Sequence, residues 1–178
     1  MRQIKWVLLG VLILSCGFAN AASKEVIDAK VREALAIFAK ESPAGIELME
    51  KAAGVLVFPD VIKIGFGLGG EYGEGSLLID GEPQAYYSTA AGSFGFQLGA
   101  QFKTELILFM TDASLERFRG SNGWEAGVDG SVALVTVGVG GAIDTKTMQK
   151  PIVGFVFSNR GLMYNLTLEG SKITKIDR

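Results

Sequence analysis

The sequence alternates glycine with bulky apolar residues in the stretch IGFGLGG, residues 64–70. The same alternation returns in SFGFQLGAQF, residues 93–102, where the apolar residues again occupy every second position. A period of two is typical of a β-strand with two unlike faces, so we expect strands with one bulky face and one nearly bare face. Glycine weakens a strand interior, and several glycines on one face indicate that another part of the molecule, or a ligand, comes close there.

The residues before this stretch have a helical period instead. Between Ser23 and Glu41 the apolar side chains recur at the spacing of an amphipathic helix, at Ile27, Val31, Ala34, Leu35 and Phe38. Ser42 and Pro43 begin a second predicted helix that runs toward Lys51. A third, shorter helix is predicted within residues 111–120, with Thr111 or Asp112 as its N-cap and Gly120 as its stop.

Strand signals dominate the chain after Gly54. A buried run at residues 55–58 is expected to stop at Pro59, and Asp80-Gly81 is a credible hairpin turn. Further strands are predicted near residues 61–70, 72–79, 84–91, 93–102, 104–110, 125–142, 151–158, 161–169 and 171–176. The fold class that follows is α+β in one glycine-rich domain, with N-terminal helices packed on a long, curled antiparallel sheet or partly closed β-barrel.

The first 21 residues have the features of a secretory signal peptide, which leaves residues 22–178 as the domain. Two basic residues precede an apolar run, and Ala19-Asn20-Ala21 forms an A-x-A cleavage site. We therefore expect a periplasmic protein. A lipoprotein anchored through Cys16 is the alternative, because residues 13–16 loosely resemble a lipobox.

Composition excludes several classes of function. Without residues 1–21 the chain has 15 basic and 19 acidic residues, a net charge of −4, which is unfavourable for general nucleic-acid binding. The chain has no histidine, and its only cysteine lies in the leader, so Ser-His-Asp and Cys-His catalysis and the nitrogen and thiolate ligands of a zinc site are excluded. We expect no enzymatic activity, no metal and no cofactor.

The glycine-rich stretch formally matches the dinucleotide-binding pattern G-x-G-x-x-G over residues 65–70. That pattern should open a helix, but the strand-like SLLI, residues 76–79, follows instead, so nucleotide binding is not predicted. Glu71 and Glu74 are expected on opposite faces of a strand, where they cannot form a carboxylate dyad, and at solvated positions.

Lys63 interrupts an apolar run just before the glycines. One interpretation is a lysine that extends to solvent from a sheet edge. The other is a cation beside closely approaching backbone, which suits an anionic head group. The helix over residues 23–41 is similarly ambiguous, since its basic and apolar residues suit an anionic membrane while four acidic residues offset its charge. Packing against the sheet is the expectation for that helix.

Five segments in this order resemble the SYLF domain family: GVLVFP at 54–59, KIGFGLGGEYGEG at 63–75, SFGFQLGAQ at 93–101, SNRGL at 158–162 and LEGS at 168–171. The resemblance covers nearly all of the chain after the leader. It implies a lipid-binding module, whose eukaryotic members bind phosphoinositides and in some cases actin. Phosphoinositide binding is associated with a basic N-terminal helix, whereas the matching helix here is charge-balanced, so a less specific anionic lipid is expected.

The prediction is therefore a non-enzymatic periplasmic protein that binds anionic lipid or a membrane surface. The candidate lipid contacts are two basic residues, Lys63 and Arg160, and four glycines of the alternating stretch, Gly65, Gly67, Gly69 and Gly70. An outer-membrane β-barrel is an alternative, because glycine and aromatic residues in alternating strands also suit a lipid-facing wall. An envelope structural or protein-interaction module is the other alternative.

Overall fold

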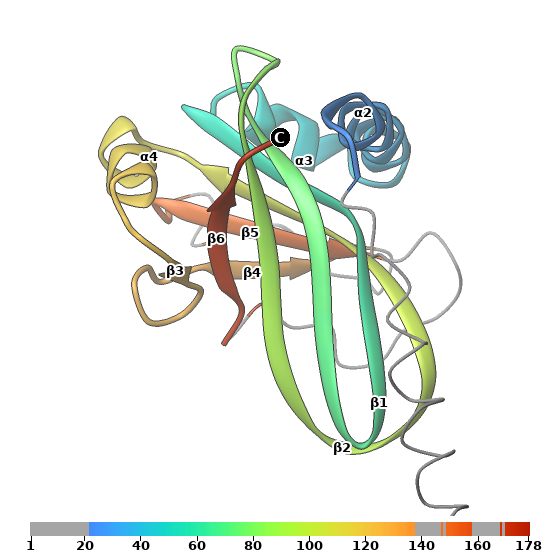
Figure 1. Cartoon of the computed structure of the whole chain (residues 1–178). Helices are drawn as coiled ribbons and strands as arrows, with labels where there is room; N and C mark the ends of the chain where they lie inside the picture. Colours follow the sequence, from blue (N-terminus) through green and yellow to red (C-terminus); the bar gives the residue numbers. More distant parts are fainter. Residues whose placement is uncertain (1–21, 138–146, 148, 158–167, 169) are drawn as a thin grey trace, which may run out of the picture.

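The computed structural model describes residues 22–137, 147, 149–157, 168 and 170–178. Two long strands dominate it (Figure 1), β1 over Gly54–Ile79 and β2 over Glu82–Phe109. They pair antiparallel along their whole length, and Asp80 and Gly81 connect them with φ angles of 52° and 80°. Two consecutive left-handed residues are characteristic of a two-residue hairpin turn, so the prediction of a hairpin at this dipeptide is confirmed.

Each strand bends back on itself partway along its length. The bend lies at the end of the described structure away from the helices (Figure 1). The pairing shifts at this bend. In β1 only Phe66 separates Gly65 from Gly67, whereas residues 96–98 separate the paired glycines of β2. β2 follows the outer path around the bend (Figure 1), and a longer path needs more residues.

The bent end consists of residues 62–70 of β1 and residues 92–102 of β2, which pair with each other. The parts of each strand before and after the bent end are its first and second arms. The two arms of β1 lie against each other, because a side chain at Gly73 would come within 2.8 Å of Val61 Cγ2.

The predicted division of this region into several shorter strands is wrong. The strand predicted near residues 61–70 continues into the one predicted near 72–79. Pro59 does not end the first run either, because it lies in a bulge between Phe58 and Val61. Proline lacks the N–H of a regular ladder, and a bulge accommodates it. The Thr104 hydroxyl donates a hydrogen bond to the Pro59 carbonyl oxygen at 2.7 Å and fastens the bulge.

The three helices form where the sequence predicts them: α2 over Lys24–Glu41, α3 over Pro43–Met49 and α4 over Asp112–Arg119. Thr111 caps α4 through a reciprocal pair of hydrogen bonds with Ser114, which fixes where the helix begins. Ser42 occupies the predicted cap position of α3, but its side chain makes no capping hydrogen bond.

In the described part of the chain the sheet also contains β3 over Trp124–Glu125, β4 over Ala133–Thr136, β5 over Ile152–Phe157 and β6 over Lys172–Ile176. Within the described residues the strand order is β3-β6-β2-β5-β4, and β1 pairs with β2. The predicted α+β fold with a long, curled sheet is confirmed. One pair, β4 with β5, is parallel rather than antiparallel. A predicted strand near residues 161–169 falls largely outside the described residues.

The sheet is buried on both faces, and successive residues of one strand enter different cores. Ile107 and Phe109 face an inner core, where Leu115 and Phe118 of α4 pack beside Trp124. Leu106 and Leu108 face an outer core beneath α2, whose buried residues are Ile27, Val31, Ala34 and Phe38. Phe38 is completely buried, with its ring 4.9 Å from that of Phe155. The prediction that α2 packs on the sheet is therefore confirmed.

Candidate functional site

The bent end contains most of the residues that the sequence singles out. Lys63 is partly exposed in β1 and lies opposite Gln101 of β2. The pairing places glycine against glycine at Gly65 with Gly99 and at Gly67 with Gly95. The side-chain surroundings of Gly65 and Gly67 lie outside the described residues, as does Arg160, so their predicted lipid contacts stay predictions.

The two remaining candidate glycines follow directly in β1. Gly69 lies opposite Ser93, and Gly70 lies opposite Gly92. A side chain at Gly70 would meet only the Ala91 carbonyl oxygen among the described atoms, at an ordinary contact distance of 3.7 Å. Close approach of another segment therefore does not explain the glycine at position 70.

Close approach does explain two glycines of the second arm. A Cβ at Gly75 would lie 1.9 Å from the Val57 carbonyl oxygen, and one at Gly73 would lie 3.1 Å from the Val61 Cα. Only a residue without a side chain lets the two arms of β1 pack this closely. The alternation at residues 64–70 predicts a contact of this kind, and the described glycines that make one, Gly73 and Gly75, lie farther along the strand.

Charged side chains are nearly absent from the bent end, where Lys63 is the only one. The nearest acidic residues on either side are all paired with cations. Asp60 Oδ2 lies 2.9 Å from Lys30 Nζ, and Glu71 Oε2 lies 2.9 Å from Lys103 Nζ. Lys63 makes no ion pair with a described residue. The electrostatic character of the bent end is therefore weakly positive.

Large apolar side chains are exposed at the same place. Ile64 is 61% exposed and Ile62 37%, while Tyr72, just past the bent end, is 52% exposed. The Tyr72 hydroxyl donates a hydrogen bond of 2.8 Å to Glu74, which also pairs with Arg178 at the end of the chain. The bent end thus carries exposed apolar residues and one cation, and polar side chains lie where it joins the second arm of β1.

A buried charge cluster lies at the base of the bent end and links the arms. Lys103 Nζ is 2.8 Å from Glu105 Oε1 as well as 2.9 Å from Glu71 Oε2, and all three side chains are at most 7% exposed. Ser171, beside β6, donates a hydrogen bond of 3.3 Å to the other oxygen of Glu71. Glu105 Oε2 has no hydrogen-bond partner among the described residues.

Burial and charge both change proton binding in this cluster. Complete burial raises the pKa of Glu105 to about 7, because desolvation outweighs the opposing attraction of Lys103. Burial lowers the pKa of Lys103, but the two carboxylates more than offset this and raise it above its ordinary value. The expectation that Glu71 and Glu74 are solvated is wrong, since their side chains are only 7% and 13% exposed. Their predicted placement on opposite faces fits their different partners.

This cluster was not predicted from the sequence, because Lys103 and Glu105 are remote from Glu71 in the chain. Their spacing of two within a strand was the available signal, since it places both on one face. In the described part of the chain, no group of three acidic, histidine or cysteine residues has a geometry that would hold a metal ion. Glu71, Lys103 and Glu105 form a buried ion-pair network.

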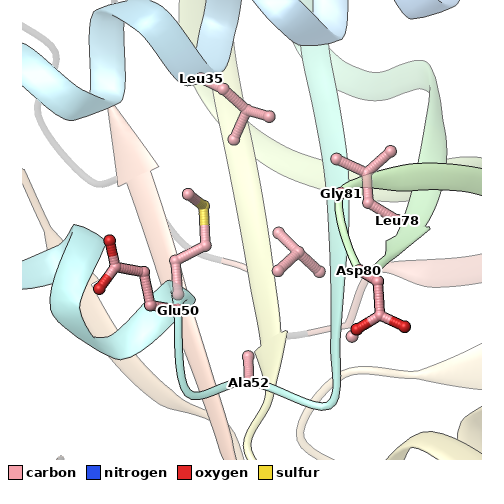
Figure 2. A pocket seen from close by; sticks show the side chains of 9 residues that line it. Leu35, Glu50, Ala52, Leu78, Asp80 and Gly81 are labelled. Carbon is pink, nitrogen blue, oxygen red and sulfur yellow. The ribbon is translucent and has the colours of Figure 1, made fainter.

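A pocket of about 290 Å³ lies beside the Asp80-Gly81 turn (Figure 2). This turn is at the opposite end of the hairpin from the bend (Figure 1). Its walls come from α2, from the residues after α3 and from β1, with Leu35, Ala52 and Leu78 among the lining residues. Glu50 and Asp80 also line it, with their carboxylates on opposite sides (Figure 2). Two acidic groups disfavour an anionic ligand, so this pocket does not fit the predicted lipid head group.

Comparison with known proteins gives one family. The model of the family Ysc84, described as Las17-binding protein actin regulator, matches residues 90–178, which is half of the chain. A search of curated proteins finds no match. The matched residues include the β2 side of the bent end, whereas Lys63 precedes them. None of the helices in the described residues is long and apolar enough to cross a membrane.

Proposed function

Because the chain belongs to the Ysc84 family, which is the SYLF domain family that its motifs resemble, we propose that it binds anionic lipid at a membrane surface and catalyses no reaction. Membership in this family implies a lipid-binding or actin-regulator-like role. The observation that carries the lipid proposal is the charge pattern at the bent end. Lys63 is its only charged residue, and the flanking carboxylates of Asp60, Glu71 and Glu74 are paired with cations.

This pattern favours an anionic surface for a physical reason. An unpaired carboxylate beside Lys63 would cancel its attraction for lipid phosphate, whereas a paired one contributes little net field at a distance. A single lysine near an anionic membrane contributes about 1 kcal/mol, so the attraction is weak. It also fades as salt shortens the Debye length to about 8 Å at 0.15 M.

Vesicle co-sedimentation tests the proposal. The protein should bind vesicles of phosphatidylcholine mixed with phosphatidylglycerol at low salt, and bind phosphatidylcholine alone less well. Lys63→Ala should weaken binding to the anionic vesicles about fivefold, the equivalent of about 1 kcal/mol.

Lys40→Ala is the matched control, because Lys40 is exposed in the last turn of α2. It should bind like the parent. If no vesicle composition retains the parent protein at low salt, the lipid proposal fails. A protein-interaction role in the envelope then becomes the better explanation, as the description of the family as Las17-binding allows.

We also propose that the protein functions in the bacterial periplasm. The support is the leader-like sequence of residues 1–21, with small residues at both positions of its A-x-A site. The intact mass of protein purified from an envelope fraction should correspond to a chain that begins at Ala22. A diacylated chain that begins at Cys16 would replace this proposal with the lipoprotein alternative.

A further inference from the structure

We infer that the bent end of the β1–β2 hairpin enters the bilayer, with Ile62 and Ile64 in contact with the acyl chains and Tyr72 at the head-group level. This inference rests on the proposed lipid binding, and it adds the mode of attachment. Surface attraction through Lys63 alone would leave these three side chains in water. Insertion would bury them.

The first support is the place of the bent end among the described elements. β6 pairs with β2 at residues 86–90, and β5 pairs with it at residues 104–109. Between these two segments, β2 pairs with β1 and with no other described strand. In Figure 1 the bend extends away from α2, α3 and α4. Ile62 and Ile64 are 37% and 61% exposed there and are available to a surface.

The second support is the direction of the exposed side chains. Gly73 meets Val61 on the inner faces of the two arms, so Ile62 and Tyr72, one position along each strand, lie on the outer faces. Ile64 lies on the same face as Ile62, about 7 Å nearer the bend. An inserting bent end would thus present apolar side chains outward.

The third support is the order of polarity along the hairpin. The base carries the ion pairs of Asp60 and Glu74. Tyr72 and Ile62 come next, each one position nearer the bend than the Gly73–Val61 contact, with the Tyr72 hydroxyl hydrogen-bonded back to Glu74. Ile64 and a bend whose only charge is Lys63 lie beyond them. Tyrosine suits the boundary between water and hydrocarbon, where one end of the side chain is apolar and the other is hydrated.

The amphipathic helix α2 is the competing element for insertion, and its apolar face is already occupied. Ile27 and Val31 are each 2% exposed and Phe38 is fully buried against the sheet. Releasing α2 to a membrane would open the outer core. The bent end needs no such rearrangement, because Ile64 is exposed in the folded protein.

Charged groups limit how deep the bent end can go. The ion pairs of Glu71 and Glu74 lie just past it in β1, and charged groups are costly in hydrocarbon, so the bent end is expected to stop in the interfacial layer. A shallow attachment by a few aliphatic side chains fits a reversibly bound protein.

Fluorescence of an environment-sensitive label tests the inference. In a Cys16→Ser background, Ile64→Cys labelled with NBD should shift its emission to shorter wavelength on vesicles of phosphatidylcholine and phosphatidylglycerol. A quencher attached to the lipid acyl chains should reduce that emission. Val128→Cys with the same label is the matched control, because Val128 is a 73% exposed aliphatic residue in the turn after β3, and its emission should not change.

A second variant tests the energetics without a label. Ile64→Ser should weaken vesicle binding that persists in 1 M salt, where the Debye length is about 3 Å, whereas Val128→Ser should not. The expected loss is about tenfold or more for a fully buried isoleucine. Circular dichroism of each variant verifies that the exposed substitutions leave the fold intact.

The outcomes separate the two proposals. Binding that depends on Lys63 but leaves the label at position 64 unchanged would overturn insertion and leave lipid binding standing. Equal emission shifts at positions 64 and 128 would indicate adsorption without a specific orientation, which also overturns the inference. An absence of binding to every vesicle would reject the proposed function itself.

Discussion

Gly75 occupies the closest contact between the two arms of β1. Its missing side chain leaves room for the Val57 carbonyl oxygen, which a Cβ would approach to 1.9 Å. Backbone atoms cannot move aside as the end of a flexible side chain can. Any residue other than glycine at this position must therefore separate the arms, which also carry Leu56, Phe58 and Leu77 into the inner core.

Gly75→Ala is predicted to be strongly destabilising for this reason. Overpacking of a core costs about 1–3 kcal/mol and occasionally more, and the backbone clash places this variant at the upper end. Gly92→Ala is the control, since no described atom lies within 4 Å of the added Cβ. Urea denaturation of the two variants gives the comparison. A similar midpoint for both would contradict the close packing of the arms.

The pairing between arms also has an electrostatic part, the cluster of Glu71, Lys103 and Glu105. Glu71 belongs to the second arm of β1, and the other two belong to the second arm of β2, so the ion pairs join elements that the hairpin ladder does not pair. Two carboxylates share one ammonium group in a nearly dry site. Desolvation of the fully buried Glu105 carboxyl group is the main cause of its raised pKa, and the negative charge of Glu71 adds to it against the opposing attraction of Lys103.

The raised pKa of Glu105 predicts a fall in stability as pH rises. Its folded-state pKa of about 7 exceeds the ordinary value of 4.5, so the native protein binds the proton more tightly than the unfolded chain does. The contribution of this proton to the free energy of unfolding is complete below pH 4.5. It is lost between about pH 4.5 and 7 and stays lost above that range. Over this window, Glu105→Gln should gain about 1–3 kcal/mol of unfolding free energy relative to the parent.

Denaturant titrations at a series of pH values measure this difference. Glu116→Gln, an exposed position on α4, is the control and should follow the parent at every pH. If the stability of Glu105→Gln runs parallel to that of the parent from pH 4.5 to 8, the buried carboxyl group does not titrate as the cluster requires.

At the scale of the whole molecule, the two cores share the same strands. Leu106 and Leu108 enter the outer core beneath α2. The residues that alternate with them, Ile107 and Phe109, enter the inner core beneath α4. Neither core can lose its strand residues without disturbing the other. This arrangement links the N-terminal helices to the C-terminal half of the chain through β2.

The shared strands predict a single cooperative unfolding transition. Trp124 is 1% exposed in the inner core, and the only other tryptophan, Trp6, lies in the predicted leader, so fluorescence of the processed protein reports the inner core. Far-ultraviolet circular dichroism reports the helices and the sheet together. The two signals should give the same midpoint and slope in urea. Loss of the helical signal at lower urea would show that α2 and α3 unfold separately.

Local patterns in the sequence were sufficient for most elements. The apolar spacing of α2, the Thr111 cap of α4 and the Asp80-Gly81 turn each depend on residues within a few positions of one another. Such signals are physical preferences of the local chain, so they are visible without knowledge of the fold. The near absence of charge around Lys63 is equally a property of the sequence alone.

Only the tertiary structure decided what those elements contact. That β1 continues through Pro59 and the glycines depends on Thr104 and on the path of β2 around the bend. The burial of Glu71 depends on Lys103, which is distant in the chain and reaches it only once the hairpin has bent back on itself. Period and composition determined which residues form strands and helices, because those preferences are local. Which glycine is compressed and which carboxyl group is buried is set by long-range packing, which no local pattern encodes.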